Sequence, residues 1–155
     1  AHAIQDLYGV EYCAVIKNIV AMACGITRGL GFGDNFQAVL VSNAMQEIKI
    51  FLDVVYPEKN RDLNSSGYLG DLLVTAYSQF SRNRTFGNMI GRGYSVKSAQ
   101  IEMNMIAEGY YAVRSIYSIS RQHNIKLPII EAVYNIVYEK ANPMLEMNKL
   151  KGFLK

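Results

Sequence analysis

The chain has 155 residues, of which 50% are apolar and 19% are charged, and this balance indicates one globular domain rather than a disordered chain. The net charge of +3 is too small for a dedicated nucleic-acid binder and suits a small anionic ligand. No run reaches the roughly 18 apolar residues of a membrane helix, and no signal-peptide pattern opens the chain. We therefore expect a cytoplasmic protein without membrane insertion.

The sequence predicts neither a disulfide nor a metal site. Cys13 and Cys24 are eleven residues apart in one expected helix, which separates them by roughly 16 Å and predicts two reduced core thiols. The only histidines are His2 and His123, and neither Cys-x-x-Cys nor His-x-x-x-His spacing occurs. The chain opens at Ala1 without an initiator Met, so we expect it to be part of a longer protein.

An apolar helix is predicted near the start of the chain. Residues 9–24 carry apolar side chains on nearly every side at helical spacing, and only Lys17 and its neighbour interrupt them. The glycines that follow, from Gly25 onward, are expected to end this helix. Asp34 is a natural N-cap for a second helix, which is expected to end near Tyr56.

The rest of the chain predicts a series of shorter helices. A polar loop over residues 58–67 precedes helical spacing over residues 69–80. Further helices are expected over residues 86–90, from the Ser95 cap to residue 103, over residues 108–123, over residues 128–140 with Pro128 in the first turn, and after Asn142-Pro143. Neither the alternating pattern of a sheet nor an internal linker is present. We therefore predict a single compact all-α, multi-helix domain over residues 1–155.

Lys17 is the sharpest chemical feature of the sequence. An ammonium inside an apolar helix is costly unless it is paired or faces a polar cleft. One interpretation is a lysine that exchanges a proton with a substrate oxygen or polarises a carbonyl. An equally open interpretation is a lysine that packs its methylenes and reaches water at the domain edge. Asp71 becomes relevant if the fold brings it to Lys17, and Asn18 either orients a ligand or is a satisfied core amide.

A second cluster, Ser81-Arg82-Asn83-Arg84, lies at an expected helix start. Free backbone N–H groups, the helix dipole and a forked guanidinium favour phosphate there. A solvated basic loop with Ser81 as a simple cap is the alternative that so short a motif favours. The glycine run over residues 29–33 follows a helix rather than a strand, which excludes a Rossmann dinucleotide loop.

Five motifs follow one another in a specific order and spacing. They are Val10-Glu11 with Ile16-Lys17-Asn18, Gly29 to Asn35, Leu69 to Leu72, Ser81 to Arg84, and Ala107 to Gly109, with a further match over residues 128–139. Together they resemble the C-terminal half of NAD(P)-dependent glycerol-3-phosphate dehydrogenases. The resemblance implies a two-domain dehydrogenase with a 6-phosphogluconate-dehydrogenase-like C-terminal half. Its N-terminal Rossmann domain, which binds most of the NAD or NADP, is absent from this chain.

The resemblance also implies roles for residues of this sequence. Lys17 is the catalytic proton acceptor, and Asp71 is its catalytic partner at the substrate. Ser81, Arg82 and Asn83 are the substrate-binding residues that contact phosphate and hydroxyl groups.

Further residues complete the implied site. Asn18 and Thr75 extend the substrate pocket, whereas Arg82, Ile106 and Glu108 match cofactor-contacting positions. The segment over residues 53–66 is more polar than the family pattern and receives no role.

The leading hypothesis is therefore the substrate-binding half of sn-glycerol-3-phosphate dehydrogenase. That enzyme interconverts dihydroxyacetone phosphate and sn-glycerol 3-phosphate by nicotinamide hydride transfer, for glycerophospholipid synthesis. The expected partners are the phosphorylated substrate and the chain's own Rossmann domain, and a homodimer is left open. Without the Rossmann domain, which contributes a second lysine in this family, we expect the chain to be inactive.

Two alternatives remain open. One is a non-catalytic all-α module that binds nucleic acid through a patch of Arg82, Arg84, Arg92 and Lys97. The other is a related two-domain hydroxyacid dehydrogenase that uses the same helical lysine on another substrate.

Overall fold

The computed structural model describes residues 6–155, so Ala1 and His2 lie outside the described residues. The elements are α1 (Leu7–Gly29), α2 (Asp34–Val55), a π-helical turn η1 (Ser66–Gly70), α3 (Asp71–Tyr77), α4 (Arg82–Gly91), α5 (Val96–Met103), α6 (Glu108–Gln122), α7 (Pro128–Tyr138) and α8 (Pro143–Lys151). No strand occurs within the described range. The predicted all-α fold class is therefore confirmed.

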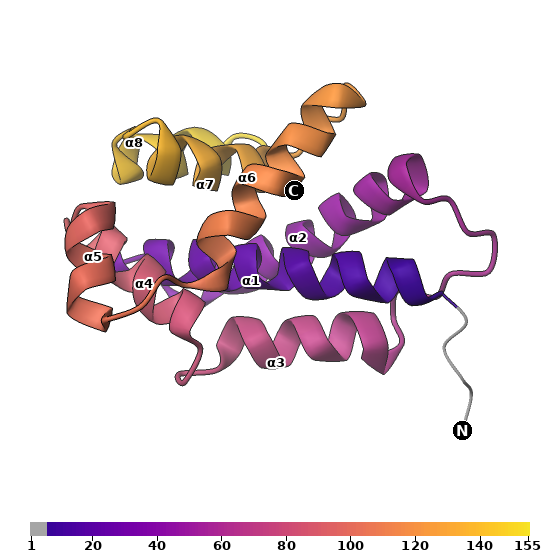
Figure 1. Ribbon diagram of the computed structural model, residues 1–155, viewed down its shortest axis with the longest axis horizontal. Helices are drawn as coiled ribbons and strands as arrows, with labels where there is room; N and C mark the ends of the chain where they lie inside the picture. Colours follow the sequence, from indigo (N-terminus) through magenta and orange to yellow (C-terminus); the bar gives the residue numbers. More distant parts are fainter. Residues whose placement is uncertain (1–5) are drawn as a thin grey trace.

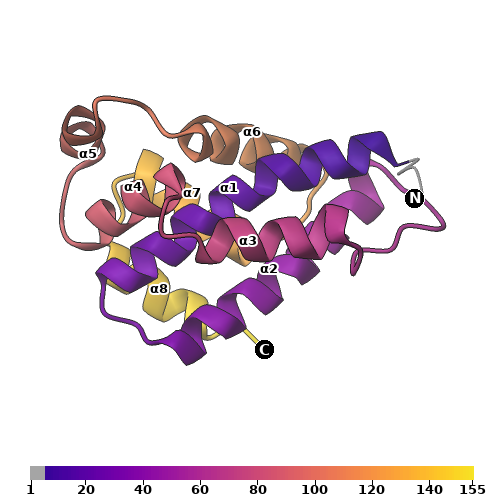
Figure 2. The same ribbon diagram turned by 90° about the horizontal axis from the view of Figure 1, so that it is seen from below.

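Helix α1 is the central element of the fold. It contacts α2, α3, α4, α6 and α7. Figure 1 shows it running across the middle of the molecule, with α3 beneath it and α7 and α8 above, and Figure 2 shows α6 on the opposite side from α2. Its length and apolar composition would suit a membrane span, but 61% of that segment is buried inside the protein, as in the core helix of a globular domain.

The core is built on the apolar residues of α1. Its large buried members include Ile16, Ile19, Met22 and Ile26 of α1, together with Phe51, Leu72, Phe86 and Ile129 from the surrounding helices. Cys13 and Cys24 are free and buried in the same core. Burial raises the pKa of Cys13 to about 11 and that of Cys24 to about 12, so both remain thiols at neutral pH.

Helices α1 and α4 approach each other backbone to backbone. Two pairs of glycines spaced by four residues permit this approach: Gly25 and Gly29 on α1, and Gly87 and Gly91 on α4. A Cβ added at Gly25 would lie 2.1 Å from the carbonyl oxygen of Arg84. The prediction that the glycines from Gly25 onward end the first helix is wrong at this point, because α1 continues to Gly29 and uses the glycines for packing.

Several predicted helix caps are confirmed. The side chains of Ser81, Ser95 and Asn142 accept hydrogen bonds from backbone N–H groups in the first turns of α4, α5 and α8. Pro128 occupies the first turn of α7, as predicted. The predicted Asp34 cap is wrong: Gly33 is the N-cap of α2, and the Asp34 carboxylate instead accepts a hydrogen bond from Arg28 at 2.8 Å.

Some predicted boundaries also differ. The loop expected over residues 58–67 gives way at Ser66 to η1, and α3 begins only at Asp71 rather than at residue 69. This helix ends at Tyr77 rather than residue 80, because extended backbone at Ser78 leads the chain into the cap of α4. Helix α4 is longer than the predicted 86–90 segment, whereas α7 ends two residues before the predicted residue 140.

A buried carboxylate joins α2 to α7. Glu47 is 7% exposed and accepts hydrogen bonds from the backbone N–H groups of Ile129 at 2.8 Å and Ile130 at 3.4 Å. These N–H groups open α7, where no carbonyl of the helix is available to them. Burial nevertheless raises the pKa of Glu47 to about 8, outweighing the hydrogen bonds, which lower it.

This raised pKa predicts a pH-dependent stability. Because the folded protein holds the Glu47 proton more tightly than the unfolded chain, the stabilisation is complete below about pH 4.5 and is lost as pH rises through about 8. Between these values the free energy of unfolding should fall by up to about 1.4 kcal/mol per pH unit relative to Glu47→Gln. Urea unfolding at several pH values measures the difference. Glu102→Gln, at an exposed position of α5, is the control, and parallel profiles for native protein and Glu47→Gln would contradict the prediction.

The α1–α4 contact predicts a large effect of a single methyl group. Gly25→Ala should lower the free energy of unfolding by roughly 3 kcal/mol, because the new Cβ meets rigid backbone. Gly152→Ala is the matched control, since its Cβ would lie 3.4 Å from its nearest neighbour. Equal stability losses in urea denaturation would show that the close approach is unimportant.

Candidate active site

The fold brings Asp71 to Lys17. Lys17 lies in the middle of α1, and Asp71 is the first residue of α3. The Lys17 ammonium donates a hydrogen bond from Nζ to Oδ2 of Asp71 at 2.6 Å, and the two side chains are 22% and 39% exposed. The ammonium is therefore partnered by an opposite charge at a partly open position, which explains its place in an apolar helix.

The start of α6 packs against both α1 and α4. Asn83, which is 8% exposed, accepts a hydrogen bond at Oδ1 from the backbone N–H of Gly109 at 2.7 Å. Asn18 donates from Nδ2 to Oε2 of Glu108 at 3.3 Å. A Cβ at Gly109 would lie 2.9 Å from the carbonyl oxygen of Asn18, so this glycine allows the close approach. The hydrogen bond from Gly109 occupies the side-chain oxygen of Asn83, so the NH2 group of Asn83 is the part that a ligand can contact.

A cavity of about 360 Å³ lies where α3, α4 and α6 meet. Five of the residues singled out in the sequence line it: Thr75, Ser81, Arg82, Asn83 and Glu108. Lys17, Asn18 and Asp71 are not among the lining residues, but two lining residues connect the Lys17–Asp71 pair to the cavity. Thr75 lies one turn after Asp71 on α3, and Glu108 accepts a hydrogen bond from Asn18, the neighbour of Lys17. Ile106 is 43% exposed and lies outside the lining, between Met105 and Glu108, which belong to it.

The N-terminus of α4 opens on this cavity. The first N–H groups of a helix have no carbonyl partner within the helix, and its dipole favours an anion there. Ser81 caps the helix by accepting a hydrogen bond at Oγ from the Arg84 N–H at 3.3 Å, and the Arg82 side chain is exposed. Arg84 is differently engaged, because its Nη1 donates to the carbonyl oxygen of Ala76 at 3.2 Å and ties α4 to α3.

Four residues of the cavity wall were missed in the sequence. They are Val74, Ser78, Phe80 and Met105, which line the cavity together with the residues above. Phe80 is 95% exposed although it is a large aromatic residue. Its position directly before the Ser81 motif was the available signal, since an aromatic side chain beside a polar motif often marks a binding surface.

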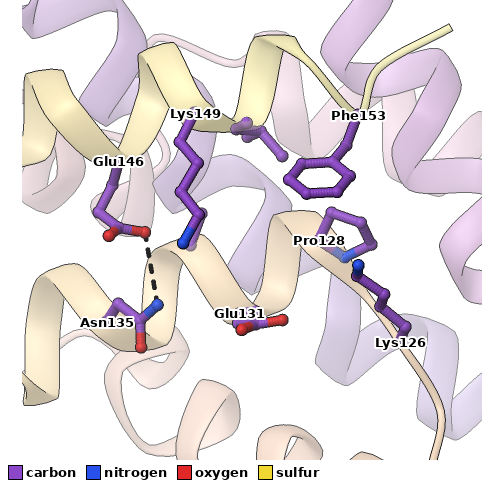
Figure 3. A pocket seen from close by; sticks show the side chains of 9 residues that line it. Lys126, Pro128, Glu131, Asn135, Glu146, Lys149 and Phe153 are labelled. Atoms are coloured by element: carbon purple, nitrogen blue, oxygen red, sulfur yellow. Dashed lines mark hydrogen bonds between the residues drawn. The ribbon is translucent and has the colours of Figure 1, made fainter.

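Two other cavities formed by the described residues do not combine these features. A pocket of about 210 Å³ between α7 and α8 presents mixed charges from Glu131, Glu146 and Lys149, and Asn135 donates to Glu146 across it at 3.4 Å (Figure 3). A broader hollow of about 730 Å³ between α2 and α3 is lined by apolar side chains together with polar and charged ones, among them Lys49, Arg61 and Asp62. Among residues 6–155, no group of three His, Cys, Asp or Glu side chains is arranged to hold a metal ion. The cavity beside Lys17 is therefore the candidate active site.

Comparison with known proteins gives one consistent family. The family model described as NAD-dependent glycerol-3-phosphate dehydrogenase C-terminus matches residues 6–148. A relative from Staphylococcus carnosus, named glycerol-3-phosphate dehydrogenase [NAD(P)+], is 42% identical over 146 residues, which cover 94% of this chain and 43% of that protein. A relative of the same name from Chlamydia caviae is 40% identical over 135 residues, or 87% of this chain and 40% of its own length.

Solved structures agree with the sequence relatives. The crystal structure of glycerol-3-phosphate dehydrogenase from Coxiella burnetii matches with a TM-score of 0.89 and 34% identity, over 94% of this chain and 45% of that one. The chain thus spans less than half the length of the relatives it matches. Its similarity over nearly its whole length places it in the C-terminal portion of these proteins. The chain belongs to the NAD-dependent glycerol-3-phosphate dehydrogenase family and corresponds to the C-terminal domain of its members.

Proposed function

We propose that this chain is the substrate-binding half of an NAD(P)-dependent sn-glycerol-3-phosphate dehydrogenase, serving glycerophospholipid synthesis. The observation that carries the proposal is the 2.6 Å Lys17–Asp71 pair beside a cavity onto which the N-terminus of α4 opens. The pair offers a proton donor, and the helix terminus with Arg82 offers an anion site. Dihydroxyacetone phosphate needs both, because it carries a reducible carbonyl and a phosphate in one small molecule.

The phosphate of the substrate would occupy the start of α4. The Ser81 hydroxyl, the Arg82 guanidinium and the Asn83 NH2 group supply donors from consecutive residues, together with the backbone N–H groups of the first turn. Binding the phosphate away from the reacting carbon uses its binding energy to orient the carbonyl. Thr75, on the α3 side of the cavity, adds a hydroxyl for the remaining polar atoms of the substrate.

Lys17 would handle the proton of the reaction. In the reductive direction its ammonium donates a proton to the carbonyl oxygen as the carbon accepts a hydride, and the resulting amine recovers a proton from solvent. In the oxidative direction the neutral amine accepts the hydroxyl proton of glycerol 3-phosphate. Asp71 orients the ammonium through its hydrogen bond, and Asn18 fixes the neighbouring Glu108 carboxylate.

The residues at the rim fit one edge of NAD or NADP. Arg82 offers an exposed guanidinium for an anionic or carbonyl group, Ile106 offers an exposed apolar surface, and Glu108 offers an acceptor. Nicotinamide supplies the hydride when the dinucleotide is bound. We expect most of the dinucleotide contacts to come from an N-terminal Rossmann domain of the complete enzyme.

That Rossmann domain would cover the apolar rim of the cavity. Val74 is 71% exposed and Phe80 is 95% exposed, and both line the cavity. Ile106 extends this exposed surface from the neighbouring α5–α6 connection. Large apolar side chains gathered at a polar cavity are typical of a surface that another domain covers. Without that domain, water would reach the proposed reaction site. This supports the expectation that the isolated chain is inactive.

Replacing the ammonium should abolish proton transfer. In the complete two-domain enzyme, Lys17→Met should lower kcat for dihydroxyacetone phosphate reduction by about a thousandfold, since general acid catalysis contributes about 10²–10⁴-fold. Steady-state kinetics measures the loss, and circular dichroism checks that the helices remain. Lys49→Met removes an exposed ammonium from α2 as the control. Turnover within tenfold of the native enzyme would refute the role of Lys17.

Removing the guanidinium should weaken phosphate recognition. Arg82→Ala should raise the KM for dihydroxyacetone phosphate by about tenfold to a hundredfold, because it removes a charge-assisted contact. The reaction of unphosphorylated dihydroxyacetone should change far less, which separates phosphate binding from a general defect. Arg92→Ala, at the exposed end of α4, is the control. An unchanged KM for the phosphorylated substrate would exclude Arg82 as its ligand.

A further inference from the structure

A second polar cluster is buried at the opposite end of the α1–α3 contact from α4. It consists of Asp6, Arg61 and Tyr68, and we call it the Asp6 cluster. The side chains of Arg61 and Asp6 are 4% and 10% exposed, and Tyr68 is 3% exposed. Arg61 donates from Nε, and Tyr68 from its hydroxyl, to Oδ2 of Asp6, both at 2.5 Å.

The Asp6 cluster joins three separate segments of the chain. Asp6 also caps α1 by accepting a hydrogen bond from the Gly9 N–H at 3.1 Å. Arg61 donates from Nη2 to the carbonyl oxygen of Tyr56 at 2.7 Å, where α2 ends. Tyr68 belongs to η1, the turn that leads directly into α3. The Asp6 carboxylate thus connects the start of α1 to the turn before α3 directly, and to the end of α2 through Arg61.

The charge states in the cluster are fixed around neutral pH. The Arg61 hydrogen bond, as the largest influence, lowers the pKa of Asp6. Burial, followed by the hydrogen bond to Asp6, raises the pKa of Tyr68 to about 12. The cluster is therefore an ion pair with a neutral phenol that donates to the same carboxylate.

The same turn is attached to α1 near the active site. The Cys13 thiol donates to the carbonyl oxygen of Tyr68 at 4.0 Å, and Cys13 lies one turn before Lys17 on α1. Three residues after Tyr68, Asp71 accepts the hydrogen bond from Lys17. Segment 68–71 is therefore attached to α1 at three successive levels, at Asp6, at Cys13 and at Lys17.

Helix α3 is held by the buried side chain of Leu72 and by the hydrogen bond from Arg84 to Ala76, but its N-terminus depends on the turn before it. It contains only seven residues, and no side chain caps its N-terminus. A helix this short is marginal by itself, so its first residue takes its position from the preceding turn. The hydrogen bonding within the cluster is also incomplete, because Nη1 of Arg61 is buried without a hydrogen-bond partner. Burial of an incompletely satisfied guanidinium suggests a task beyond stability.

We propose that the Asp6 cluster positions Asp71, and through it the Lys17 ammonium, for proton transfer. Its members are positioning residues, because they hold the turn before Asp71 and none of them lines the cavity or forms a hydrogen bond with Lys17. The proposal rests on the proposed function, because it assigns the cluster to the proton-transfer pair of that reaction. It also gives a role to Arg61 in the polar segment over residues 53–66. A displacement of about 1 Å at a reacting group can reduce a rate by about a hundredfold, so a remote anchor of this kind can control turnover.

Tyr68→Phe tests the proposal with the smallest change. It removes the hydroxyl that holds η1 to Asp6 and keeps the buried ring. In the complete two-domain enzyme we expect kcat to fall about tenfold, with the KM for dihydroxyacetone phosphate changed by less than about twofold. Tyr77→Phe is the matched control on α3, because the Tyr77 side chain is 46% exposed and outside the cluster, and its kcat should be unchanged. A purely structural role would lower the midpoint of thermal unfolding and leave kcat per folded enzyme intact.

A double-mutant cycle with Asp71→Asn shows whether Tyr68 acts through Asp71. If it does, Tyr68→Phe should reduce kcat by less than about twofold in the Asp71→Asn background, because positioning no longer matters there. Equal reductions in both backgrounds, or an unchanged kcat for Tyr68→Phe alone, would overturn the proposal. Arg61→Lys is the second variant should Tyr68→Phe fail to fold. It keeps the charge, replaces the forked donors, and is subject to the same expected and contradicting results.

The two proposals fail in distinguishable ways. If Lys17→Met and Asp71→Asn retain turnover, the proposed function of the site is wrong. If these variants lose turnover while Tyr68→Phe and Arg61→Lys keep the native kcat, the active site stands and the positioning role of the Asp6 cluster is wrong.

Discussion

An ammonium in the middle of an apolar helix needs an opposite charge and an outlet to water, and the organisation of this domain follows from meeting both needs for Lys17. Asp71 supplies the charge at 2.6 Å, and the partial exposure of both side chains supplies the opening to water. Helix α1 must stay buried to remain the centre of the core, yet in the proposed function one of its residues must reach a substrate. The short helix α3 meets both requirements, because its first residue, Asp71, places a carboxylate beside Lys17 on the buried helix α1.

The α1–α4 contact then determines what the lysine faces. Glycines on both helices let the backbones touch, so the start of α4 lies beside the C-terminal half of α1, where Gly25 meets Arg84. The start of α4 carries Ser81, Arg82 and Asn83, and Asn83 in turn holds the first turn of α6 against it. Close packing of the glycines thus places the proposed anion-binding start of α4 in the same region of the fold as the proposed proton donor, Lys17.

Much of this arrangement could be predicted from the sequence, for physical reasons. Helical periodicity and caps such as Ser81 and Asn142 are local signals, so the helices and many of their starts were predictable. Lys17 was conspicuous because its charge conflicts with its apolar surroundings. The role of Gly25 in packing was not predictable, because a glycine that ends a helix and one that contacts another helix look alike in sequence. Glu47 and Arg61 were missed because their partners lie 82 and 55 residues away, beyond any local pattern.

The proposed function requires a single substrate position that spans Lys17 and the start of α4. The most direct test is a crystal structure of the complete two-domain enzyme with dihydroxyacetone phosphate bound. We predict the phosphate at the Ser81–Asn83 backbone and the Arg82 guanidinium, with the carbonyl oxygen within hydrogen-bond distance of Nζ of Lys17. A phosphate bound elsewhere, or a carbonyl oxygen that faces away from Lys17, would contradict it.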